Sequence, residues 1–248
     1  MLQLESLGEI MTQSSSDIRR ELVQASHVLA HEDILDGFGH VSARHPVRPD
    51  RFLISTVRAP ELSRDEDLVE LDFNGDAVEA HNSRLFAERF VHAAVYAARP
   101  DVMAVCHHHA PAILPFCVTG VPLVPVVHLG ATMGSIVPFW DSQDEFGDTN
   151  LLVANLEQGR SMARALGAHW TVLLRRHGAT VAGRSIRELV FRAIYGARNA
   201  EIQRHAMMFG KAAGLRLAES LAAEEFNLKP IALDRNWERW LRRAEAQN

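Results

Sequence analysis

Residues 101–110 read Asp-Val-Met-Ala-Val-Cys-His-His-His-Ala, an apolar run that ends in three consecutive imidazoles. The run predicts a buried β-strand, in which successive side chains point to opposite faces. His107 and His109 then lie on one side of the strand end, and His108 lies on the other. Two imidazoles on the same side can chelate one divalent metal ion, although a solvated polar strand end has the same pattern.

The bulk properties favour a globular enzyme-sized domain. The chain has 248 residues, 47% hydrophobic and 23% charged, which suits a single α/β core. A net charge of −5 without a basic run argues against a nucleic-acid partner. No apolar stretch reaches the roughly 18–20 residues that cross a membrane, and the N-terminus lacks the basic start of a signal peptide. Cys106 and Cys117 lie in apolar contexts typical of reduced thiols, so we expect a cytoplasmic protein.

Helical and strand patterns alternate along the chain, which predicts a layered α/β domain. Asn74-Gly75 is a hairpin signal and indicates a sheet that is not purely parallel. Asp17, Asp148-Thr149 and Ser185 can cap helices, and a break at Asn155 is an option in the third helix. We expect helices over 17–36, 85–98, 148–166 and 185–209, a helix or turn over 110–117, and strands over 40–45, 52–55, 68–72, 102–107, 124–128, 135–138, 170–175 and 179–182.

Composition divides the chain into three parts. Residues 1–16 are expected to be a flexible N-terminus, residues 17–212 one domain, and residues 213–248 a charged, helix-prone C-terminal appendage. Trp237 and Trp240 give this appendage an apolar side, with which it can dock on the domain or on another subunit.

Two further side chains have the chemistry to complete a metal site. His177 follows an apolar strand and precedes Gly178, where an imidazole can enter a pocket close to the backbone. Glu88 lies near the start of an otherwise apolar-faced helix. Each has an ordinary alternative, because a single strand-end histidine is usually structural and a single helix glutamate is usually solvated.

Four short motifs follow one another in a characteristic order: Gly-x-Val-Ser-x-Arg at 39–44, Glu-x-x-x-His at 88–92, His-x-His at 107–109 and His-Gly at 177–178. This order, over roughly residues 17–210, resembles the class II aldolase/adducin family, which includes fuculose- and rhamnulose-phosphate aldolases. The resemblance implies a three-layer α/β/α sandwich with a central mixed, largely antiparallel sheet. It commonly implies a homotetramer with active sites between neighbouring subunits.

The resemblance also implies a metal site. His107, His109 and His177 would bind a divalent metal, with Glu88 as a fourth ligand or as a base. Such a donor set leaves room for substrate oxygens and suits Zn²⁺ or Mn²⁺, with Fe²⁺ as a third option.

Three positions depart from the phosphate-binding residues of the sugar-phosphate aldolases. His40 stands where those enzymes have asparagine, Phe86 and its neighbour stand where they have two serines, and the segment from Ser55 to Arg58 replaces their Thr-Gly. Their catalytic tyrosine has no counterpart, because the local sequence places His128 in this region.

These departures favour a flat anion over a phosphorylated sugar. Arg58 can bind a carboxylate and Phe86 can lie against a ring. The Gly-His-Val-Ser-x-Arg segment and the Arg-Ala-Pro-Glu-Leu run at 58–62 resemble the family branch that decarboxylates hydroxylated aromatic diacids, such as dihydroxyphthalate and hydroxy-methylpyridine-dicarboxylate. We therefore expect a metal-dependent decarboxylase of a small aromatic carboxylate.

The expected chemistry is coherent. A ring hydroxyl and an ortho carboxylate chelate the metal, which stabilises the negative charge that develops as carbon dioxide leaves. An acid then protonates the ring carbon, and His40, His128 and Glu88 are the candidates. His92, one turn after Glu88, can orient that carboxylate. The alternatives are a backbone-bonded His40, a solvated Arg58 and a core His128.

Three other functions fit the same motifs. They are an aldolase for a non-phosphorylated hydroxy-carbonyl substrate, a non-catalytic adducin-like interaction domain, and an oxygen-dependent iron enzyme. The four filled ligand positions argue against the interaction domain. The metal site cannot separate the two lyases, because both reactions need stabilised negative charge, so the surrounding pocket must do so.

Overall fold

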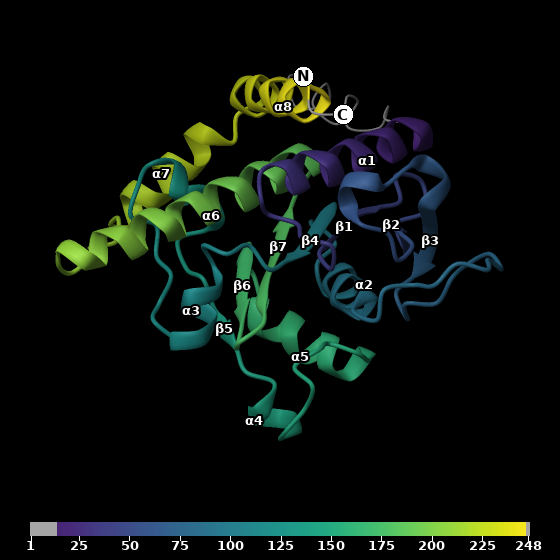
Figure 1. Ribbon diagram of the computed structural model, residues 1–248, viewed down its shortest axis with the longest axis horizontal. Coiled ribbons are helices and arrows are strands. Elements are labelled where there is room, and N and C mark those ends of the chain that lie inside the picture. Colours follow the sequence, from purple (N-terminus) through teal and green to yellow (C-terminus); the bar gives the residue numbers. More distant parts are fainter. Residues whose placement is uncertain (1–13, 247–248) are drawn as a thin grey trace, which may run out of the picture.

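The computed structural model describes residues 14–246. Of the expected flexible segment 1–16, residues 1–13 lie outside this range, and Ser15 and Ser16 belong to the first helix. Its centre is a seven-stranded sheet in the order β3-β2-β1-β4-β7-β6-β5 (Figure 1). All neighbouring strands are antiparallel except β5 and β6, which are parallel. The strands are β1 His40–Arg44, β2 Arg51–Ser55, β3 Leu68–Asp72, β4 Ala104–His108, β5 Phe139–Trp140, β6 Thr171–Leu174 and β7 Gly178–Gly183.

Helices cover both faces of the sheet, which confirms the predicted three-layer sandwich with a mixed, largely antiparallel sheet (Figure 1). Strand alternation divides the apolar side chains between two cores. Val41 and Cys106 pack with the helices α1 (Ser15–His31), α6 (Ile186–Phe209) and α8 (Pro230–Glu245). Val105 packs on the opposite face with α2 (Arg89–Ala98) and α5 (Leu156–Leu166).

The remaining helices are short or peripheral. They are α3 Leu114–Thr119, α4 Gln143–Phe146 and α7 Leu217–Asn227, with 3₁₀ turns at Pro60–Leu62, Asp65–Asp67 and Leu129–Met133. Trp237 and Trp240 of α8 are buried in the core shared with α1 and α6. Within residues 14–246, no helix combines the length and apolar character that a membrane crossing requires.

Helix boundaries differ from several of the predictions. α1 begins at Ser15 with Ser14 as its N-cap, because Ser14 and Asp17 form a capping box, and it ends at His31 rather than near 36. The predicted cap at Asp148-Thr149 is wrong, since the Asn155 side chain caps α5. Ser185 caps α6 as predicted.

The strands predicted at 124–128 and 135–138 are wrong. The backbone of the first segment is satisfied by side chains of α6 rather than by a neighbouring strand. Val126 N–H donates to Asn199 Oδ1 at 2.8 Å, and Asn199 Nδ2 donates to the Val124 carbonyl at 2.8 Å. The edge strand β5 begins only at Phe139, after the second segment.

Candidate metal centre

Strand register brings the first candidate residues together. β4 lies between β1 and β7, so that His107 stands opposite His40 on one side and Thr180 on the other. Alternation turns His107 toward the α2 and α5 face. His108 faces away from this site and is buried, with its Nδ1 accepting the Ala110 N–H at 3.2 Å. The strand therefore presents alternate histidines, as the sequence predicts.

His177 lies at the tip of the tight hairpin between β6 and β7. The preceding Arg176 adopts a left-handed φ of 54°, and the His177 N–H donates to the Leu174 carbonyl at 3.1 Å. Gly178 allows the hairpin to approach β4 closely. A Cβ at this position would lie 2.3 Å from the His108 carbonyl oxygen and 2.8 Å from His109 Cδ2. The His-Gly motif is thus required by close packing against the strand that carries the other imidazoles.

Glu88 is the N-cap residue of α2 and precedes the helix, which starts four residues later than the predicted 85. Its side chain does not cap the helix, so the carboxylate is free to point toward the imidazoles. Glu88 Oε1 accepts the Val153 N–H at 3.0 Å, and the side chain is buried. A backbone donor from the loop before α5 therefore fixes one carboxylate oxygen and leaves Oε2 to the histidines.

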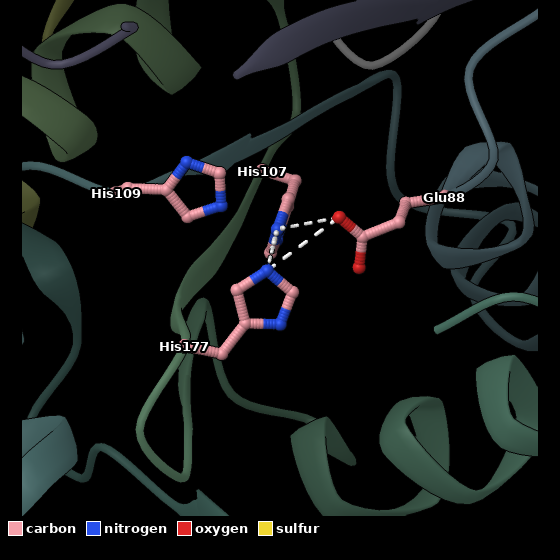
Figure 2. Close-up of side chains that lie close together, drawn as sticks. All are labelled: Glu88, His107, His109 and His177. Carbon is pink, nitrogen blue, oxygen red and sulfur yellow. Dashed lines mark hydrogen bonds and ion pairs between the residues drawn. The ribbon is translucent and has the colours of Figure 1, made fainter. Parts of the chain in front are cut away.

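The four candidate ligands converge on one point (Figure 2). Glu88 Oε2 lies 3.6 Å from His107 Nε2 and 3.5 Å from His177 Nε2, and the two Nε2 atoms are 3.4 Å apart. Ligands about 2.1 Å from a tetrahedral ion are about 3.4 Å from one another. One ligand atom from each of the four residues, His109 included, lies within 4.8 Å of the others. The donor set fits one divalent metal ion.

The electrostatics of the cluster match a cation site. Burial alone would raise the pKa of Glu88, but His107 and His177 outweigh burial and hold this pKa well below its usual range. Burial lowers the pKa of His107 strongly, so this imidazole is neutral, which is the form that binds metals. Burial also opposes protonation of His177, yet the Glu88 carboxylate raises its pKa. The negatively charged Glu88 carboxylate thus faces His107 and His177, and the group has the charge and the donor atoms to bind a cation.

His109 is oriented from behind by a carboxylate that the sequence did not reveal. Its Nδ1 lies 3.1 Å from Asp36 Oδ1, while its buried Nε2 has no hydrogen-bond partner in the described part of the chain. A buried nitrogen without a partner is costly, and a metal ion would satisfy it. Such histidine–carboxylate pairs fix the ring orientation of metal ligands. The Asp36 carboxylate also accepts the N–H groups of Phe38 and Gly39, at 3.0 and 2.8 Å.

His40 is buried next to the candidate ligands, and His92 holds it in place. The sequence predicts a different role for His92, the orientation of Glu88. His40 Nδ1 and His92 Nε2 are 2.7 Å apart, and His92 Nδ1 lies 2.6 Å from Ser42 Oγ. Both nitrogens of His92 are therefore engaged, and neither orients Glu88. The His40 ring lies 5.4 Å from His107, centroid to centroid.

The other predicted substrate residues are spread around the site. The Phe86 ring lies beside His40, with ring centroids 4.6 Å apart and ring planes tilted by 50°. Ser55 is buried at the end of β2, and the turn after it reaches the loop before Glu88, since the Val57 N–H donates to the Arg84 carbonyl at 2.9 Å. Arg58 lies on this turn and pairs with Asp67 at 3.2 Å.

His128 does not join the cluster within this chain. Both its ring nitrogens lie 3.4 Å from Asn227 Nδ2, and its ring is near Phe226, with centroids 6.3 Å apart. The ring therefore packs against α7.

Residues 20–204 match the family model of the class II aldolase and adducin N-terminal domain. The chain belongs to the class II aldolase/adducin family. It is 34% identical over 251 residues to decarboxylase tropJ of Talaromyces stipitatus, covering 91% of this chain and 93% of the relative. It is 30% identical over 191 residues to a 3,4-dihydroxyphthalate decarboxylase of Arthrobacter keyseri, covering 71% and 73%. These relatives confirm the resemblance to the decarboxylase branch of the family.

The fold of this family is also seen in solved structures. The L-fuculose 1-phosphate aldolase of Glaciozyma antarctica superposes with a TM-score of 0.78 at 20% identity, covering 97% of this chain and 96% of that one. At this identity the similarity establishes the shared fold. The reaction has to be inferred from the residues of the site.

Proposed function

We propose that this protein is a metal-dependent decarboxylase of a hydroxylated aromatic carboxylic acid. The protein is a carbon–carbon lyase that acts on a small molecule, since two of its relatives are named as decarboxylases. The observation that carries the proposal is the pair of rings beside the ligands, His40 and Phe86, 4.6 Å apart. These rings, whose planes are tilted by 50°, stand where the sugar-phosphate aldolases have small polar phosphate-binding residues, so they favour an aromatic substrate over a phosphate.

His107, His109, His177 and Glu88 would hold one divalent ion, Zn²⁺ or Mn²⁺ in the first place and Fe²⁺ as a third option. The bound ion supplies a Lewis acid that stabilises negative charge while carbon dioxide leaves. Among the residues considered for proton transfer, Glu88 is ionised because of its depressed pKa, and it serves as ligand or base. His128 packs on α7, so His40 is the candidate imidazole that lies beside the proposed ligands.

The direct test combines metal analysis with product analysis. Purified protein is assayed for carbon dioxide release across a panel of hydroxyphthalates and hydroxypyridine dicarboxylates, before and after removal of metal by a chelator. We expect release from at least one hydroxylated diacid, lost on chelation and restored by one of the three metals. Cleavage of an aldol substrate to pyruvate or an aldehyde, without decarboxylation, would refute the proposal. Activity that requires oxygen would indicate iron chemistry instead, and a metal-free, inactive protein would indicate an interaction domain.

Arg58 provides a narrower test of the pocket. It lies on the turn beside the Phe86 segment, where it can meet a substrate carboxylate. We expect Arg58→Ala to raise KM about tenfold or more while metal content is unchanged, because a charge-assisted hydrogen bond contributes about 1.5–3 kcal/mol. Arg64→Ala is the matched control, since Arg64 is exposed and pairs only locally with Glu66. An unchanged KM would remove Arg58 from the pocket.

We further propose a cytoplasmic homotetramer whose active site lies near a subunit contact. Large apolar side chains at the end of α6 and on α7 are exposed in one chain, including Met208 at 80%, Phe209 at 93% and Phe226 at 62%. Exposed large apolar side chains support a subunit interface, because a monomeric protein rarely leaves many of them in water. Light scattering combined with gel filtration measures the mass directly, and a monomer at micromolar concentration would refute this part.

A further inference from the structure

Four side chains form a buried hydrogen-bonded chain that leads away from the proposed site. His40 Nδ1 lies 2.7 Å from His92 Nε2, His92 Nδ1 lies 2.6 Å from Ser42 Oγ, and Ser42 Oγ lies 2.8 Å from Tyr96 Oη. All four are at most 2% exposed. The register of β1 and the helical spacing of α2 bring them together, because His40 and Ser42 share one strand face and His92 and Tyr96 are one turn apart.

The direction of these hydrogen bonds follows from the far end of the chain. Burial raises the pKa of Tyr96 well above its usual range, so the phenol keeps its proton and must donate it. Among residues 14–246, the acceptor that it meets is Ser42 Oγ. Ser42 then donates its own proton to His92 Nδ1, the second partner of its hydroxyl. His92 therefore carries its proton on Nε2 and donates it to His40 Nδ1.

We propose that this chain fixes His40 as a neutral hydrogen-bond donor whose proton sits on Nε2, and that this N–H binds an acceptor oxygen of the substrate. Nε2 is the end of the ring that makes no hydrogen bond within the described residues. The ligand class is a carboxylate or phenolate oxygen next to the metal-binding groups. Ser42, His92 and Tyr96 are positioning residues in this scheme. The substrate contact rests on the proposed function, whereas the tautomer does not.

The same geometry argues against His40 as the acid that protonates the ring carbon. A second proton on Nδ1 would have to point at His92 Nε2, so His92 would carry its own proton on Nδ1 and donate it to Ser42 Oγ. Either the Ser42 or the Tyr96 hydroxyl proton would then lack an acceptor in a buried position, which costs about 1–3 kcal/mol. Burial also disfavours charge here and lowers the pKa of His92 to about 3. His40 is thus a fixed donor, and the proton for the ring carbon comes from another group.

The tautomer can be measured by nitrogen-15 NMR of histidine-labelled, zinc-loaded protein, with the His40 signal assigned by its loss in His40→Gln. We expect the proton on Nε2 in the wild type. Ser42→Ala removes the hydroxyl that donates to His92 Nδ1, so His92 loses its preferred tautomer and a mixture of His40 tautomers is expected. In Tyr96→Phe the Ser42 hydroxyl keeps His92 as its acceptor, so we expect the His40 proton to stay on Nε2. A wild-type proton on Nδ1, or a tautomer unmoved by Ser42→Ala, would overturn the proposal.

Two controls separate this inference from general structural damage and from the proposed function. Tyr195→Phe removes a half-buried hydroxyl whose partner is Asn236, at 3.0 Å, and we expect no change in the His40 tautomer. In the decarboxylase assay, His40→Gln can donate a hydrogen bond but cannot transfer a proton. We expect it to retain kcat/KM within about tenfold, whereas His40→Leu loses about 10²-fold. Equal losses in both would assign proton transfer to His40. An absence of decarboxylation by the wild type would refute the function and leave the tautomer result intact.

Discussion

The substitution Gly178→Ala tests whether the metal site depends on the close approach of the β6–β7 hairpin to β4. Gly178 does not have a left-handed backbone, so alanine brings no intrinsic strain there. The added Cβ would lie 2.3 Å from the His108 carbonyl oxygen, more than about 1 Å short of the 3.4 Å at which ordinary contact begins. This neighbour is backbone in the middle of the sheet and cannot rotate away.

The hairpin tip must therefore move, and His177 moves with it. The three close ligand atoms are 3.4 to 3.6 Å apart, so a displacement of about 1 Å removes the tetrahedral spacing. We expect metal affinity to fall about 10–100-fold, which is the usual loss when the orientation of a metal ligand is disturbed. Overpacking in the core should cost a further roughly 1–3 kcal/mol of stability.

The assay is zinc binding measured by competition with a chromogenic chelator, together with thermal unfolding in the presence and absence of metal. Gly37→Ala is the matched control, because a Cβ at Gly37 meets no atom within 4 Å and the residue lies close to the same site. We expect the control to bind zinc like the wild type. Wild-type affinity in Gly178→Ala would show that the hairpin geometry does not govern the ligand set.

Three further substitutions probe the support of the site and of the fold. Asp36→Asn keeps the turn but removes the charge behind His109, and we expect zinc affinity, measured by the same competition, to fall about 10–100-fold. Arg192→Met removes the guanidinium that pairs with the buried Glu188 and the half-buried Glu224, and it should cost about 3–5 kcal/mol in denaturant unfolding. Arg164→Met, in an exposed pair, should cost less than about 1 kcal/mol. Trp240→Ala, at a position only 1% exposed, should cost about 3–5 kcal/mol in the same experiment; a loss under 1 kcal/mol would show that α8 is only loosely docked.

The grouping of the four candidate ligands could be predicted from the sequence, because each of them is marked by a local pattern. Alternation along one strand separates His107 from His108, and the His-Gly pattern marks the hairpin that carries His177. The family order then links these motifs to Glu88. The layered α/β class follows from the alternation of helices and strands, and the three-layer sandwich follows from the family resemblance. Trp240 in the tail indicates a segment that packs on the domain.

The partners of the site residues could not be predicted, because they depend on contacts between distant segments. Asp36 reaches His109 only after α1 has ended and the loop has folded back, over 73 positions in the sequence. His92 is one helical turn from Glu88, which favoured a contact between them, but its nitrogens bond to His40 and Ser42 instead. Helical spacing shows which side chains share a face and does not show which strand residues they meet.

The metal ligands and the His40 side of the proposed site are held in place by different parts of the fold. The ligands come from the end of β4, the β6–β7 hairpin and the start of α2, and backbone or carboxylate contacts outside the cluster hold Glu88 and His109 in place. Because the ligands are already spaced for an ion, little binding energy is needed to order them. The β1–α2 pair instead supplies His40 and its partners. In the function proposed above, the metal centre would supply the chemistry that aldolases and decarboxylases share, and the hydrogen-bonded chain would hold His40 as a donor to a substrate oxygen.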